Sequence, residues 1–263
     1  DLTFAQSATT ETNLDTAILT GTASGEVDIS GNTFNDFIGT GSNAVIRTSG
    51  KVTGKLIIGS QGAAGAGNTF DNPDNPYTGI RVSDTGSEIE TDDNTLNNVG
   101  DSKFGIRVED ADGVTIGING SDINGLTDGT GIDVDPSDSS ATALLDSNAI
   151  DVDVDDDSST GIDVEVPNNE DLLQVNNTDI TGENGADISG ITFSGQVADT
   201  TGNLQIEVTG PGDDSAGITD VRQALEFNLQ APSTSTSTFK TNVNVTDTQT
   251  TVDNSNGYGI DTT

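Results

Sequence analysis

The chain has 263 residues, of which 30% are apolar and 4% aromatic, and its 44 acidic residues against 8 basic ones give a net charge of −36. This acidity excludes nucleic acid and anionic membrane surfaces as partners, because both are bound through clusters of Lys and Arg. The absence of Cys excludes disulfides, thiolate metal sites and thiol redox chemistry.

The first segment in chain order, residues 1–25, precedes any repeat, and we expect it to be an N-terminal extension or a cap strand. The sequence begins at Asp1 rather than Met, which fits removal of a secretory signal but also fits a trimmed chain. We expect a secreted protein, outside the cell or at its surface. We expect no membrane insertion, because no run of about 18 apolar residues is present.

A repeat fills residues 26–195 and is the strongest signal in the sequence. Its first marker, Gly-Ile-x-Val, recurs at intervals of 26, 26 and 30 residues. The four copies are Gly79-Ile80-Arg81-Val82, Gly105-Ile106-Arg107-Val108, Gly131-Ile132-Asp133-Val134 and Gly161-Ile162-Asp163-Val164. A second marker is a polar turn that ends in an apolar residue, as in Gly31-Asn32-Thr33-Phe34, Gly67-Asn68-Thr69-Phe70, Asp93-Asn94-Thr95-Leu96, Gly120-Ser121-Asp122-Ile123, Ser147-Asn148-Ala149-Ile150 and Asn177-Thr178-Asp179-Ile180. Two markers in constant order indicate one repeated supersecondary unit.

About 26 residues suffice for one coil of three short strands and three turns. In each Gly-Ile-x-Val copy, Ile and Val should point inward and the residue between them outward, because side chains alternate along a strand. The Asn of the second marker should lie at a turn and form an amide ladder with the Asn above and below. The sequence therefore predicts an all-β fold, a right-handed single-stranded parallel β-helix with coils of about 26 residues.

The Asn-x-Phe and Gly-Ile-x-Val alternation resembles the parallel β-helix repeats of the pectin-lyase-like superfamily, over residues 26–188. That superfamily includes polysaccharide lyases and hydrolases, surface adhesins and phage tailspikes, so the resemblance implies a fold and leaves several functions open. Two short motifs of its polygalacturonase-type members are matched by Asn177-Thr178-Asp179 and Asp213-Asp214. Their Gly-His-Gly and Arg-x-Lys elements have no counterpart, since the chain has no His and no Arg-x-Lys. We therefore expect no catalytic residues and no enzyme, with a polysaccharide-degrading enzyme kept as an alternative.

Four carboxylates form the predicted metal site. If the repeats stack in register, Asp133, Asp135, Asp163 and Glu165 lie about 5 to 7 Å from one another on the outer face of the repeated strand. Oxygen ligands of this kind suit Ca²⁺, which is the one candidate cofactor. The sequence favours instead a solvated acidic surface adapted to high salt, as in halophilic proteins, because no spaced calcium-loop motif is present. Between Val108 and Val221 there are 26 acidic residues and no Lys or Arg, so counterions must accompany this surface.

The last segment, residues 196–263, keeps the alternation but loses the register of the turns. It ends on Gly259-Ile260-Asp261, another copy of the first marker, and we expect irregular β coils with an open end. An open end can act as a template for another chain. Thr-rich stretches at 236–241 and 246–251 raise ice binding as a third class of function, although no Thr-x-Thr column is evident in the repeats.

These observations favour a structural role. We expect a subunit of an extracellular filament or surface layer that self-associates head to tail through its coil ends or by strand exchange. The alternative is a monomeric adhesin or stalk that binds surface glycans. Asn119, Asn176 and Asn244 begin Asn-x-Ser/Thr triplets and are predicted glycosylation sites.

Overall fold

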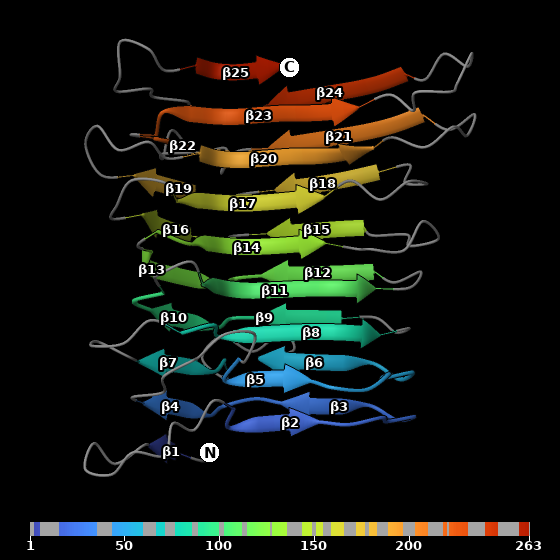
Figure 1. The fold of residues 1–263 in the computed structure, drawn as a ribbon, viewed down its shortest axis with the longest axis vertical. Coiled ribbons are helices and arrows are strands. Elements are labelled where there is room, and N and C mark those ends of the chain that lie inside the picture. Colours follow the sequence, from blue (N-terminus) through green and yellow to red (C-terminus); the bar gives the residue numbers. More distant parts are fainter. Residues whose placement is uncertain are drawn as a thin grey trace.

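The computed structural model describes the chain in segments. They are residues 3–5, 16–35, 44–59, 67–71, 77–85, 89–99, 103–111, 115–126, 128–135, 144–148, 151–154, 159–165, 172–176, 179–182, 189–196, 203–209, 218–219, 221–230, 240–246 and 258–262. Within these segments the secondary structure is β throughout, and the strands stack into a parallel β-solenoid (Figure 1). No helix in these segments is long and apolar enough to cross a membrane.

Three parallel sheets form the walls of the solenoid. Sheet A consists of β1 (Thr3–Ala5), β4 (Thr33–Asn35), β7 (Thr69–Asp71), β10 (Thr95–Asn97), β13 (Asp122–Leu126), β16 (Asp151–Val154), β19 (Asp179–Gly182) and β22 (Ile218–Thr219). Sheet B consists of β2 (Ile18–Thr20), β5 (Ile46–Thr48), β8 (Ile80–Thr85), β11 (Phe104–Ala111), β14 (Thr130–Asp135), β17 (Thr160–Glu165), β20 (Ser189–Gln196), β23 (Gln223–Gln230) and β25 (Tyr258–Thr262). Sheet C consists of β3 (Val27–Ile29), β6 (Leu56–Gly59), β9 (Ile89–Asp92), β12 (Thr115–Asn119), β15 (Leu144–Asn148), β18 (Leu172–Asn176), β21 (Asn203–Thr209) and β24 (Lys240–Thr246).

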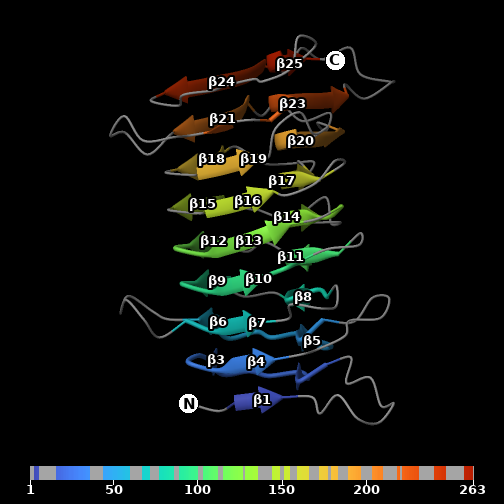
Figure 2. The ribbon, with the colours of Figure 1, turned by 90° about the vertical axis from the view of Figure 1, so that its left-hand side faces the viewer.

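Each coil contributes one strand to each sheet, so every strand pairs with its equivalents one coil before and one coil after. Only a few residues separate β3 from β4 and β9 from β10, and Figure 2 shows sheets C and A meeting coil by coil. With neighbouring strands about 4.8 Å apart, the nine strands of sheet B give a stack roughly 40 Å tall. The ends of the chain lie at opposite ends of this stack (Figure 1).

The core is a set of apolar columns, as the alternation predicted. Ile80, Ile106, Ile132 and Ile162 pair in register along sheet B and are fully buried. On sheet A, Phe34 pairs with Phe70, and their stacked rings have centroids 4.9 Å apart. Because each column is only one side chain wide, a chain with 30% apolar residues can fill it.

The glycine of the Gly-Ile-x-Val marker is required by the close approach of successive coils. A Cβ atom placed on Gly105 would lie 2.6 Å from the carbonyl oxygen of Gly131 and 3.0 Å from Ile123 Cδ1. A Cβ atom placed on Gly161 would likewise lie 2.7 Å from the carbonyl oxygen of Gly190. Any larger side chain here would push the coils apart, which explains why glycine recurs at this point of the repeat.

The predicted amide ladder is confirmed for Asn32, Asn68 and Asn94. Asn32 Nδ2 donates to Asn68 Oδ1 at 3.0 Å, and Asn68 Nδ2 donates to Asn94 Oδ1 at 3.1 Å. Asn68 and Asn94 are each at most 1% exposed, and each also donates to a backbone carbonyl, of Ile29 and Ile58 respectively, at 2.8 Å. The ladder thus satisfies buried polar groups at the corner between sheets C and A.

The predicted coil length was too short. Paired residues of sheet B are 26 residues apart around β11 but 34 apart between Ile191 and Leu225, and the average coil has about 29 residues. The strands stay in the same parallel order while the spacing between paired residues varies, so the most regular repeats gave an underestimate.

One marker was also misaligned. Ile123 pairs with Val152, so the Val of β16 occupies the position that the sequence pattern gave to Ile150. The pairing between β13 and β16 shifts register between Ile123 and Leu126, and this irregularity is not visible in the spacing of the markers.

The same three sheets continue across the boundaries proposed at residues 25 and 195. On the N-terminal side, β1 pairs with β4 and β2 pairs with β5. On the C-terminal side, β21 and β23 continue sheets C and B, and β25 adds Ile260 to the column that contains Leu225. All three predicted segments therefore contribute strands to one solenoid.

Candidate functional site

The outer face of sheet B carries the most ordered arrangement of charge in the described part of the chain. We define the charged column as the residues that pair in register with Arg107, one per strand from β2 to β25. They are Leu19, Arg47, Arg81, Arg107, Asp133, Asp163, Thr192, Glu226 and Asp261. The stacking of Arg81, Arg107, Asp133 and Asp163 that the sequence predicted is confirmed by this register.

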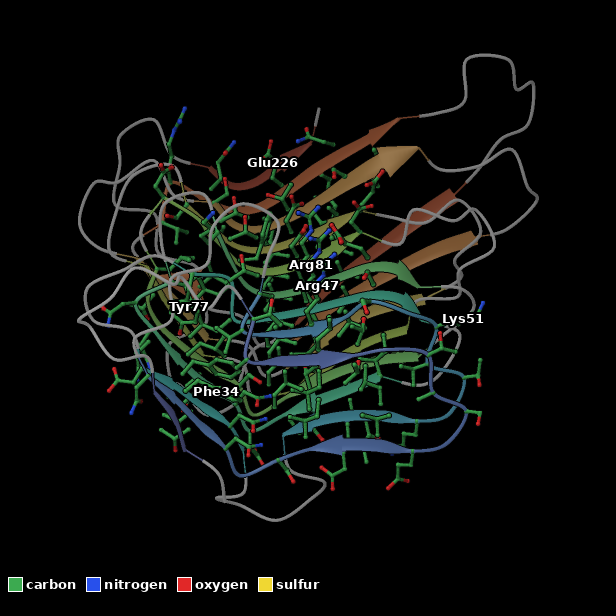
Figure 3. All side chains as sticks on the ribbon, turned by 60° about the horizontal axis from the view of Figure 1, so that its bottom comes forward. Phe34, Arg47, Lys51, Tyr77, Arg81 and Glu226 are labelled. Carbon is green, nitrogen blue, oxygen red and sulfur yellow. The ribbon has the colours of Figure 1, made fainter. Side chains whose placement is uncertain are left out.

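Two arginines connect three strands, β8, β11 and β14, through ion pairs. Arg81 Nη2 lies 2.7 Å from Glu109 Oε2, and Arg107 Nε lies 2.8 Å from Glu109 Oε1. Arg107 Nε also lies 2.7 Å from Asp133 Oδ2, and its Nη2 lies 3.8 Å from Asp135 Oδ2. The Arg107 guanidinium sits 4.3 Å from the centroid of the Phe104 ring, a cation–π contact that fixes its plane. Figure 3 shows Arg47 and Arg81 next to each other on this face, with Glu226 farther along it.

The carboxylates that follow the arginines are poorly solvated. Burial raises the pKa of Asp133 to about 7; Arg107 opposes this shift, whereas Asp163, Asp135 and Glu109 reinforce it. Burial also raises the pKa of Asp163, with further contributions from Glu226 and Asp135. The pKa of Glu165 is raised chiefly by a hydrogen bond with Asp135, then by burial and neighbouring charge. Asp163 Oδ1 is buried and has no hydrogen-bond partner.

The four predicted metal ligands lie on adjacent strands of this face. Asp133 pairs with Asp163, and Glu165 shares a hydrogen bond with Asp135. Asp133 is turned toward Arg107, which occupies one of its oxygens. Among the described residues, no group of three or more acidic side chains is arranged to hold a metal ion. Binding of Ca²⁺ by Asp133, Asp135, Asp163 and Glu165 therefore stays a prediction.

All three predicted glycosylation sites fall on strands of sheet C. Asn119 ends β12 and Asn176 ends β18, and each pairs with Asn148 of the intervening strand β15. Asn244 lies on β24 and pairs with Glu207 on β21. The hydroxyl of Ser121, the third residue of the Asn119 triplet, is fully buried and donates to the Thr91 carbonyl at 3.4 Å. In the folded chain this triplet is part of the solenoid wall.

A threonine column on sheet A was missed in the sequence. Thr3, Thr33, Thr69 and Thr95 pair in register, and the column continues as Asp122, Asp151 and Asp179. Thr33, Thr69 and Thr95 are each partly exposed. The sequence signal for this column is the single Thr in the Asn-Thr-Phe and Asn-Thr-Leu copies of the second marker, whereas a Thr-x-Thr pattern requires two Thr on one strand. The stretches at 236–241 and 246–251, on which the ice-binding idea rested, lie largely outside the described residues.

Comparisons with family models, with curated proteins and with solved structures found no match to this chain. The resemblance to pectin-lyase-like repeats therefore stands only at the level of a parallel β-solenoid.

Proposed function

We propose that the chain is a structural rod of an extracellular filament or surface layer. The observation that carries this proposal is the continuity of the solenoid. Three sheets and their buried columns keep one strand order from β1 to β25, and their first and last strands lie at opposite ends of the stack. A unit of this geometry can be extended along its axis by a further coil, supplied either by another copy or by a longer polypeptide.

The surface chemistry supports a location in saline, extracellular surroundings. Acidic residues occupy neighbouring register positions on sheet A, as Asp122, Asp151 and Asp179, and on sheet B, as Asp133 and Asp163. Like charges placed directly opposite each other on neighbouring strands destabilise a sheet. Salt at about 1 M confines this repulsion to roughly 3 Å, so the surface fits an environment rich in ions.

The alternative function is an adhesin or stalk that displays a binding site away from the cell. The partly exposed threonine column favours it, because a flat row of hydroxyls on a rigid sheet can contact a surface glycan. In this alternative the chain remains a single rod, and the outer face of sheet A contacts the ligand.

Negative-stain electron microscopy of the purified chain, in about 1 M salt with Ca²⁺ and again with chelator, separates the two functions. Regular filaments or sheets of rods are expected for the structural role. Dispersed short rods under both conditions would refute assembly, and a glycan array would then test the adhesin.

A further inference from the structure

The charged column changes sign once, close to its middle. Arg47, Arg81 and Arg107 occupy three successive strands, and Asp133 and Asp163 occupy the next two. Farther along, the column contains Thr192, Glu226 and Asp261. The basic half therefore lies toward β2 and the acidic half toward β25.

A column of this kind is complementary to itself when it is reversed. In a two-fold pair the same patch is used by both copies, so each residue that contacts the partner is contacted in return. If the two-fold axis runs along β14, every strand faces the strand at the same distance on the other side of β14. Arg47 on β5 and Glu226 on β23 are both three strands from β14, and Arg107 on β11 and Asp163 on β17 are both one strand away. These two kinds of contact join an arginine to a carboxylate, whereas Arg81 faces Thr192 and Asp133 faces its own equivalent in the other copy.

We propose that two copies of the chain pack antiparallel through the outer faces of sheet B, with the arginine half of each column against the carboxylate half of the other. A second copy is the occupant that the observations favour, because one column carries arginines in one half and carboxylates in the other, so two reversed copies present opposite charges to each other. Six of its eight basic residues lie between positions 47 and 107. This pairing is independent of any end-to-end assembly, so it stands or falls separately from the proposed filament.

Salt dependence distinguishes this contact from simple charge attraction. Each copy has a net charge of −36, so at low salt two copies repel each other over long distances. The Debye length falls from about 30 Å at 0.01 M salt to about 8 Å at 0.15 M, whereas an ion pair at 3 to 4 Å is screened much less. The dimer should therefore strengthen between about 0.01 M and 0.5 M salt, the opposite of an interface between two oppositely charged proteins.

A charge swap tests the register directly. Sedimentation velocity at about 0.5 M salt would compare the natural chain with Arg47→Glu, Glu226→Arg and the double variant. Each single change opposes like charges at two symmetric contacts and should weaken the dimer about tenfold or more, and the double variant should recover most of the loss. Lys51→Glu is the matched control, since it makes the same change of charge on the neighbouring turn, away from the column (Figure 3). It should leave the dimer within about twofold of the natural chain.

Circular dichroism and urea unfolding would verify that each variant folds, and Arg47→Gln with Glu226→Gln would replace any variant that does not. A natural chain that stays monomeric from 0.01 to 0.5 M salt at high micromolar concentration would overturn the proposal. The proposal would also be overturned if the double variant weakened the dimer as much as each single variant does, because the swapped charges would then not face each other. The proposed filament is tested separately, by electron microscopy of the same variants. If the natural chain forms filaments but no dimer, the proposed function stands and this inference fails.

Discussion

Replacing Asn68 with Ala removes the middle rung of the buried amide ladder. The Asn68 side chain makes four hydrogen bonds, two as donor and two as acceptor. Its Nδ2 donates to the Ile29 carbonyl at 2.8 Å and to Asn94 Oδ1 at 3.1 Å. Its Oδ1 accepts from the backbone N–H of Asn32 at 3.1 Å and from Asn32 Nδ2 at 3.0 Å.

The cost follows from the groups that lose their partners. Asn94 Oδ1 keeps the backbone N–H of Asn68 as a donor at 3.2 Å, and Asn32 Nδ2 keeps the Ser30 carbonyl as an acceptor at 2.9 Å. The Ile29 carbonyl loses the Asn68 amide and the Asn32 backbone N–H loses its acceptor, at a site where Asn68 is 1% exposed. Each unsatisfied buried group costs about 1–3 kcal/mol, and the lost amide bonds add to this. We therefore expect the free energy of unfolding to fall by about 3–5 kcal/mol.

Urea unfolding at constant salt, followed by circular dichroism, measures this change. Asn124→Ala is the matched control, because Asn124 Nδ2 makes one side-chain hydrogen bond, to Asn97 Oδ1 at 3.1 Å, on the partly exposed outer side of sheet A. Its loss should cost about 1 kcal/mol or less. Equal destabilisation by the two substitutions would refute the role assigned to the buried ladder.

Three other predictions concern the coils and their charge. Gly105→Ala should lower the free energy of unfolding in urea by about 1–3 kcal/mol, because the new Cβ would lie 2.6 Å from the Gly131 carbonyl oxygen. Gly21→Ala is the control and should be neutral, because a Cβ there has nothing within 4 Å. Equal effects of the two substitutions would contradict the close coil contact. The pKa of Asp133 is raised from 3.8 to about 7, so the folded chain binds this proton more tightly, and stability should rise on the order of 3 kcal/mol as the pH falls from about 8 to 4. Asp133→Asn should flatten that part of the pH profile, and an unchanged profile would exclude Asp133 as its source. Lowering the salt or removing Ca²⁺ should each lower the melting temperature, and indifference to both would contradict the requirement for counterions.

The sequence predicted those features of the fold that depend on alternation within one strand. Ile132 and Val134 are buried while Asp133 lies on the outer face, as period-2 patterning requires. The stacking of the Arg and Asp residues in the charged column followed from the same markers. The register of β16 did not, because Asn148 resembles the Asn of the second marker but lies at the end of β15, where it pairs with Asn119, and Ile123 pairs with Val152.

The contacts within the charged face were beyond the reach of the sequence for a different reason. A column fixes which residues are neighbours, but the rotamers of long side chains decide which neighbours pair. Arg107 could reach along its column or across it, and in the structure it does both, contacting Asp133 on β14 and Glu109 on its own strand. The four predicted metal ligands are neighbours for the same reason, yet Asp133 is turned toward Arg107 rather than toward the other three.

In a solenoid, distance along the sequence becomes distance along the axis, because each coil of about 29 residues advances the chain by one strand spacing of about 4.8 Å. A sequence that places six of its eight basic residues between positions 47 and 107, and 26 acidic residues with no basic one between 108 and 221, therefore builds a rod with unequal charge along its length. Two rods with this distribution repel least when they lie antiparallel, since each then brings its less negative part to the more negative part of the other. The long-range field of the rod and the short-range register of the charged column thus favour the same antiparallel arrangement.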